Sequence, residues 1–172
     1  MKFAINDTAA YAYTGAKPLV ASQPTAVFIH GAANDHCVWA LQSRYFAHHG
    51  WSALAIDLPG HGQSDGEPGT SIESLAQFVA AFLDSANVKH AAVFGHSMGA
   101  HALVQAAAFE PARFRQLVLI DPVIRSPADY HQPPPAPGET GARKSAGTAR
   151  AGRAVCRSPH SGRKGRRGSQ RT

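Results

Sequence analysis

The sequence is poor in cysteine and lacks any hydrophobic run long enough to cross a membrane. Only Cys37 and Cys156 occur among its 172 residues, which excludes a disulfide framework and a zinc site built on paired cysteines. Residues 1–7 have no apolar core of signal-peptide length. No stretch approaches the ~20 apolar residues of a membrane-spanning helix. We therefore expect a soluble cytoplasmic protein with no membrane partner.

Large apolar residues are missing from the last quarter of the chain. Residues 131–172 contain no Leu, Ile, Met, Phe, Tyr or Trp, and they hold ten Lys and Arg but one acid, Glu139. Such a segment cannot bury enough surface to fold, so a disordered basic tail over 131–172 is expected. Its Gly/Arg/Pro-rich composition is typical of a shifted reading frame in a GC-rich gene. We hypothesise that it is out of frame, which the DNA around codons 125–140 would test.

The first 130 residues have the alternating pattern of an α/β domain. A hairpin is predicted over 1–16, buried apolar strands over 25–29, 52–56, 90–94 and 116–120, and helices over 36–49, 71–83 and 98–109. Ser71 is a suitable N-cap, with Glu73 in the first turn. Strands alternating with helices indicate a mostly parallel sheet covered on both faces.

One turn between a strand and a helix has the residue pattern of a nucleophile. Residues 95–99 are Gly-His-Ser-Met-Gly, a G-x-S-x-G sequence between an apolar run and an Ala/Leu-rich stretch. In this arrangement Ser97 projects from a strained turn, and Gly95 and Gly99 allow close approach of strand and helix. The alternative is an ordinary Gly-Ser turn at a strand end.

Four segments in the same order resemble the α/β-hydrolase superfamily, in its lipase/esterase and haloperoxidase-like branch. They are Phe-Ile-His-Gly at 28–31, Asp-Leu-Pro-Gly-His-Gly-Gln-Ser at 57–64, residues 95–99, and Leu-Val-Leu-Ile-Asp-Pro at 117–122. The resemblance covers roughly residues 1–130. It implies a three-layer α/β/α sandwich with a mostly parallel sheet, which is incomplete here because the seventh and eighth strands are missing.

The resemblance also implies roles for particular residues. Ser97 would be the nucleophile that attacks a small-molecule ester, lactone or related acyl substrate. The backbone N–H groups of Ala32 and Met98 would form the oxyanion hole, and no metal or cofactor would be needed. The loop over 57–64 would be structural, with Asp57 and His61 outside catalysis.

A serine hydrolase also needs a histidine base and an acid that orients it. The resemblance implies that the acid usually follows the seventh strand and the histidine the eighth. Some lipases carry the acid after the sixth strand, which makes Asp121 a candidate for it. The remaining candidates lie in or beside the tail, without a scaffold: Asp129, His131, Glu139 and His160.

Other conspicuous residues have structural interpretations. His30 and His96 are interpreted as hydrogen-bonded supports of their loops, and Tyr45 and Phe46 as core residues. Trp39 follows the oxyanion loop and could line a pocket mouth. The remaining histidines of the body form no recognisable metal-binding motif with a carboxylate or cysteine: His36, His48, His49 and His101.

Three functions remain open from the sequence. The first is a serine hydrolase, and the second is an inactive, truncated remnant of one. The third is a nucleic-acid binder acting through the basic cluster at 163–167. No aromatic residues are interleaved in this cluster, so we do not expect a specific nucleic-acid partner. Because no seventh strand follows, residues 116–120 would form an apolar sheet edge that allows self-association.

Overall fold

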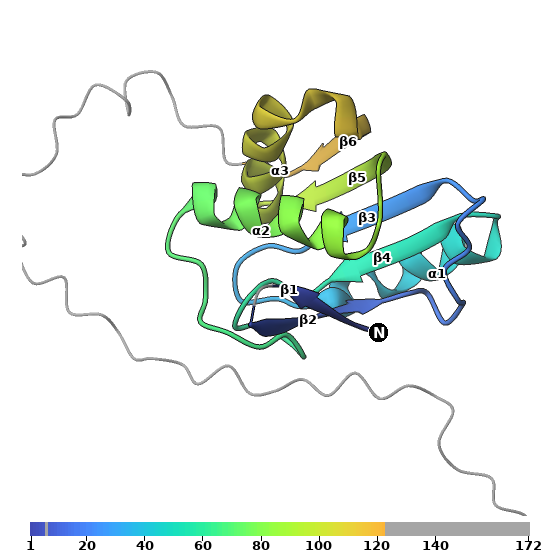
Figure 1. Ribbon diagram of the computed structural model, residues 1–172, viewed down its shortest axis with the longest axis horizontal. Coiled ribbons are helices and arrows are strands. Elements are labelled where there is room, and N and C mark those ends of the chain that lie inside the picture. The colour runs from blue at the N-terminus through green and yellow to red at the C-terminus, as the bar shows by residue number, and fades with distance from the viewer. Residues whose placement is uncertain (6, 123–172) are drawn as a thin grey trace, which may run out of the picture.

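The computed structural model describes residues 1–5 and 7–122, so the predicted tail and its candidate residues lie outside the described part. Its elements follow one another as Figure 1 shows: β1 (Lys2–Ile5), β2 (Thr8–Tyr13), β3 (Thr25–Ile29), the 3-10 helix η1 (His36–Trp39), α1 (Ala40–His48), β4 (Ser52–Ile56), α2 (Ile72–Ser85), β5 (Ala91–His96), α3 (Met98–Phe109), the 3-10 helix η2 (Pro111–Arg113) and β6 (Phe114–Ile120).

The six strands form one mixed sheet in the order β1-β2-β4-β3-β5-β6. β3 pairs in parallel with β4 and β5, and β6 pairs in parallel with β5. The β1–β2 hairpin adds antiparallel strands beside β4. Helices α2 and α3 lie on one face of the sheet and α1 on the other (Figure 1). The predicted three-layer α/β/α architecture is confirmed.

The position of β3 in the middle of the sheet explains why its sequence is continuously apolar. Val27 and Ile29 point into the core under α2 and α3, whereas Ala26 and Phe28 point into the core under α1. Because successive side chains of a strand alternate between faces, a strand covered on both sides needs apolar residues throughout. All four are fully buried.

Two aromatic residues of the α1 layer differ from the prediction. Trp39 is 4% exposed and packs against the Phe28 ring at a centroid distance of 5.5 Å, so it belongs to the core and not to a pocket mouth. Tyr45 was predicted to be in the core, but it is 61% exposed and stacks on His49. Phe46, its neighbour, does pack against this core. Tyr45 therefore faces outward from α1.

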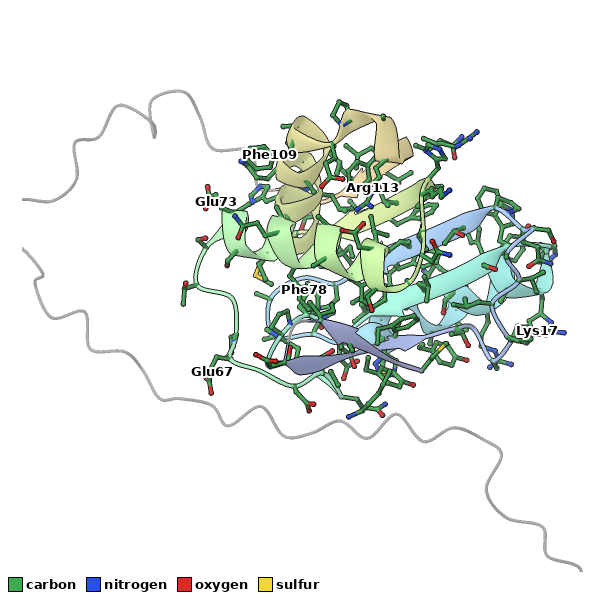
Figure 2. The ribbon with its side chains drawn as sticks, viewed as in Figure 1. Lys17, Glu67, Glu73, Phe78, Phe109 and Arg113 are labelled. Atoms are coloured by element: carbon green, nitrogen blue, oxygen red, sulfur yellow. The ribbon has the colours of Figure 1, made fainter. Side chains whose placement is uncertain are left out.

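A side-chain cap fixes the start of α2. Ser71 caps α2, and its hydroxyl accepts the N–H of Ser74 while the Ser74 hydroxyl accepts the N–H of Ser71. The predicted N-cap Ser71 and the predicted first-turn acid Glu73 are both confirmed, and Ser74 completes a reciprocal capping box. At the other end of the domain, Arg113 of η2 reaches α2, donating to the Ala80 carbonyl and pairing with Asp84 (Figure 2).

The last strand lies at a sheet edge, as predicted, and it is less buried than its apolar run alone indicates. β6 lies at one end of the sheet formed by the described residues. Leu117, Val118 and Ile120 are 39%, 37% and 42% exposed. In the described part of the chain, no further strand pairs with β6 and no helix covers its outer flank. Its sequence is apolar enough for a buried strand, but its surroundings leave it partly open.

We expect the chain to self-associate through β6, because an uncharged apolar edge pairs readily with another copy. The substitution Leu117→Lys should raise the monomer fraction in sedimentation velocity at micromolar concentration. Leu41→Lys is the matched control, since Leu41 is 79% exposed on α1, away from this edge, and it should change little. A clean monomer for the unmodified chain would contradict the expectation.

Candidate functional site

Ser97 lies between the end of β5 and the start of α3, as the sequence pattern predicts. Its backbone has φ +50° and ψ −116°, a strained conformation for a residue with a side chain. The Ser97 N–H donates to the Ile120 carbonyl at 2.9 Å, which fixes this turn to the end of β6. The strain is maintained because the strand, the helix and β6 each hold one side of the turn.

The two flanking glycines are required by close backbone contacts. A Cβ on Gly95 would lie 2.8 Å from the Ala100 backbone, inside α3. A Cβ on Gly99 would lie 2.5 Å from the His30 carbonyl oxygen and 2.7 Å from that of Ile29. Real Cβ atoms do not approach backbone so closely, so any larger residue would push α3 away from β3 and β5.

The loop after β3 lies directly against Ser97. A Cβ on Gly31 would be 2.9 Å from His96 Nδ1 and 3.2 Å from Ser97 Cβ. Ala32 therefore follows a residue in contact with the turn. Met98 is the first residue of α3, so its N–H has no acceptor within the helix. Both predicted oxyanion donors thus belong to segments that meet at Ser97.

His30 supports this loop through two buried hydrogen bonds. Its Nδ1 donates to the Gly31 carbonyl at 2.7 Å, and its Nε2 accepts the Leu58 N–H at 3.0 Å. One nitrogen must donate and the other accept, so the network assigns the neutral Nδ1–H tautomer. Burial lowers the pKa of His30. Its predicted supporting role is confirmed, and the His96 ring lies beside Gly31.

Acidification should destabilise the fold through His30. The unfolded chain binds a proton at His30 below its ordinary pKa of about 6.5, but the folded chain resists it, so stability falls as the pH drops below that value. The free energy of unfolding in urea should decrease by up to about 1.4 kcal/mol per pH unit between pH 6.5 and 5.5. The ring proton resonance of His30 should titrate at a lower pH in the folded protein than in the urea-unfolded chain. A resonance that titrates near pH 6.5 would refute this.

Asp57 organises the loop over 57–64 from inside the protein. It is fully buried, and its carboxylate accepts the backbone N–H groups of His36 at 2.7 Å and Gln63 at 2.8 Å. Gly62 wraps around it with φ +54°, and a Cβ there would lie 2.2 Å from Asp57 Oδ2. The predicted structural role of this loop agrees with these contacts.

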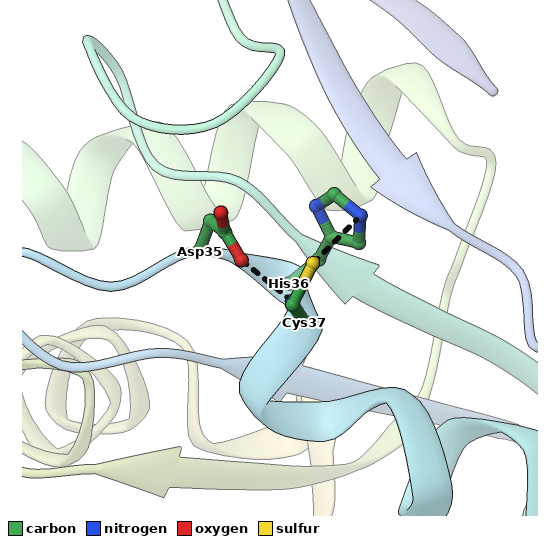
Figure 3. A group of neighbouring side chains, drawn as sticks. All are labelled: Asp35, His36 and Cys37. Atoms are coloured by element: carbon green, nitrogen blue, oxygen red, sulfur yellow. Dashed lines mark hydrogen bonds between the residues drawn. The ribbon is translucent and has the colours of Figure 1, made fainter. Parts of the chain in front are cut away.

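A second group of polar side chains was missed from the sequence (Figure 3). His36 Nδ1 lies 2.9 Å from both oxygens of Asp57, and His36 Nε2 lies 3.7 Å from Cys37 Sγ. One potential metal-ligand atom from each of Asp35, His36 and Cys37 lies within 4.8 Å of the other two, which is close enough for all three to coordinate one cation. Asp35 Oδ1, however, accepts the Cys37 N–H at 2.8 Å. These side chains therefore form a hydrogen-bonded cluster.

The described part of the chain ends just after β6, so the strands that would carry the histidine base of the superfamily are not among the described residues. Asp121, the candidate acid, directly follows the Ile120 carbonyl that accepts the Ser97 N–H. It is exposed and has φ +49°. The other candidates from the sequence lie outside the described residues: Asp129, His131, Glu139 and His160.

A cleft of about 940 Å³ opens at the other end of the strands, near the amino ends of β3, β4 and β5. Its lining includes Lys89, His90 and Arg115 but none of the residues around Ser97. It is therefore separate from the predicted site. Over residues 1–5 and 7–122, no helix combines the length and apolar character needed to cross a membrane.

Comparisons with known proteins agree with the fold. The α/β-hydrolase fold family model matches residues 24–163. A dihydrolipoyllysine-residue acetyltransferase component of an acetoin cleaving system from Cupriavidus necator is 39% identical over 100 residues, covering 58% of this chain and 26% of that protein. A haloperoxidase-like protein of Mycobacterium phage D29 is 32% identical over 96 residues, covering 55% and 34%.

Among solved structures, the enol-lactonase from Burkholderia xenovorans LB400 superposes with a TM-score of 0.59 and 26% identity. The match covers 66% of this chain and 44% of that one. The first curated relatives are also much longer, since the chain spans between 26% and 40% of their lengths. The family model nevertheless matches far more than half of the sequence, and the strand order and parallel pairing agree with it. The chain belongs to the α/β-hydrolase family.

Proposed function

We propose that this protein is a serine hydrolase that cleaves carboxylic esters, lactones or related acyl substrates. The observation that carries the proposal is Ser97, held with φ +50° between β5 and α3. Relatives with hydrolase names support it, among them an esterase/lipase-like protein of Haemophilus influenzae and a 3-oxoadipate enol-lactonase of Acinetobacter baylyi.

In the proposed reaction, the Ser97 hydroxyl oxygen attacks the acyl carbon while its proton passes to a general base. Negative charge then develops on the former carbonyl oxygen. The N–H groups of Ala32 and Met98 would stabilise that charge, and each such donor contributes on the order of 10²–10³ in rate. The acyl C–O bond then breaks, the alcohol leaves with a proton, and water hydrolyses the acyl group from Ser97. Gly31 and Gly99 support this assignment because they let the loop after β3 and the helix approach Ser97 closely. Asp121 is the proposed acid.

An organophosphonate fluoride tests the nucleophile. Ser97 Oγ would form a bond to phosphorus as fluoride leaves, and peptide mapping would identify the modified residue. We expect slow modification at Ser97 alone, lost in Ser97→Ala. Ser22→Ala is the matched control, because Ser22 is an exposed loop serine, and it should react normally. Modification spread over several serines, or none at Ser97, would count against the proposal.

A further inference from the structure

Cys37 lies in a partly buried position where its backbone is fixed. It is the second residue of η1, and the Asp35 side chain caps this turn by accepting the Cys37 N–H. Cys37 is the one cysteine among the described residues and is of intermediate exposure. Small molecules can therefore reach the thiol, while the turn holds it in one place.

His36 presents a lone pair to this thiol. Its Nδ1 lies 2.9 Å from both carboxylate oxygens of Asp57, and a carboxylate accepts hydrogen bonds. The network therefore assigns the ring proton to Nδ1 and leaves Nε2 as the acceptor. Cys37 Sγ lies 3.7 Å from that Nε2 (Figure 3). A chain of hydrogen bonds therefore links Asp57 to His36 and His36 to Cys37.

The His36 ring lies between a buried carboxylate and two aromatic rings. His36 is 6% exposed, and Asp57 is fully buried beside it. The rings of Tyr11 and Tyr13 in β2 lie at centroid distances of 4.9 and 5.9 Å, within reach of a cation–π interaction. The other charged groups nearby are the Asp35 carboxylate and the Met1 ammonium, which interacts with Asp57.

We propose that Cys37 is a nucleophilic thiol that small, uncharged carbon electrophiles modify, with His36 as its base and Asp57 as the residue that positions His36. With a haloacetamide, the thiol proton moves to His36 Nε2 and sulfur attacks the carbon bearing the halogen. A carbon–sulfur bond forms, the carbon–halogen bond breaks, and halide leaves. His36 then returns the proton to solvent. This arrangement follows the general logic of a base held by a third group.

Iodoacetamide in the presence of EDTA tests the proposal, with peptide mapping to follow Cys37 alone. The same cysteine in urea-unfolded chain is the reference. For an ordinary thiol of pKa about 8.5, the thiolate fraction falls roughly 25-fold between pH 8 and pH 6.5. The alkylation rate of native Cys37 should fall less than about threefold over the same pH range. At pH 6.5 native Cys37 should react at least roughly tenfold faster than Cys37 in the unfolded chain. A native rate with the unfolded pH dependence would overturn the proposal.

Variants separate the base from general effects on the fold. His36→Gln should reduce the Cys37 rate at pH 6.5 to that of the unfolded chain. His48→Gln on α1 is the matched control, because His48 is exposed, and it should leave the rate unchanged. If His36→Gln fails to fold, the pH profile of the unmodified chain decides alone. Ser97→Ala should also leave Cys37 labelling unchanged, which keeps this test independent of the proposed hydrolase activity.

Discussion

The 172-residue chain should hydrolyse p-nitrophenyl butyrate at roughly one millionth of an ordinary enzyme rate of ~10 s⁻¹. The reason is that the described residues end after β6, before the strands that carry the base in the superfamily, and loss of the base in such a site costs on the order of 10⁶ in kcat. A residual rate of roughly 10³–10⁴ over water is still expected from binding and backbone donors. Initial-rate measurements over a range of ester concentrations check this.

The ester hydrolysis rates of the Ser97→Ala and Ser22→Ala variants show whether any activity depends on Ser97. Both variants should remain near the low rate of the unmodified chain, because an unactivated serine contributes little. Turnover near ~10 s⁻¹ that Ser97→Ala abolishes and Ser22→Ala leaves intact would contradict the expectation. It would assign the base to a residue outside the described part, with His131 and His160 as the candidates there.

Gly99→Ala should destabilise the protein by about 3 kcal/mol, the upper end of the cost of overpacking. The added Cβ would lie 2.5 Å from the His30 carbonyl oxygen and 2.7 Å from the Ile29 carbonyl oxygen, both at the end of β3. Alanine favours a helix over glycine by about 1 kcal/mol, which is too little to offset a clash with backbone. Thermal unfolding should show a decrease in Tm of roughly 10 °C.

Gly50→Ala is the matched control for Gly99→Ala. Gly50 has φ +81° but no heavy atom within 4 Å of an added Cβ, so only backbone strain of about 1–2 kcal/mol is expected. The comparison separates close packing from conformational preference. A Gly99→Ala protein as stable as the unmodified chain would show that α3 does not approach β3 as closely as described.

The residues around Ser97 could be predicted because their signal is local. A strand, two glycines and a helix follow one another within a few residues, and both glycines meet backbone where the pattern requires it. The strands could be predicted for the same reason, since buried β3 and β4 are short apolar runs.

The His36–Asp57 pair could not be found in this way, because its partners are 21 residues apart and meet only when β4 lies beside the turn after β3. The position of β6 at an end of the sheet could be predicted, because no seventh strand follows it. How far Leu117 and Val118 are exposed could not, because their apolar run has the composition of a buried strand. Trp39 was ambiguous because one helical turn decides whether it faces Phe28 or solvent.

The structure of a Ser97 phosphonate adduct would test the proposed site most directly. A phosphoryl oxygen stands where the charged oxygen of the reaction would develop. The proposal predicts that this oxygen lies about 3 Å from the backbone nitrogens of both Ala32 and Met98. A phosphoryl oxygen directed into solvent, or two nitrogens that diverge from it by several ångströms, would contradict the oxyanion hole and with it the proposed hydrolase mechanism.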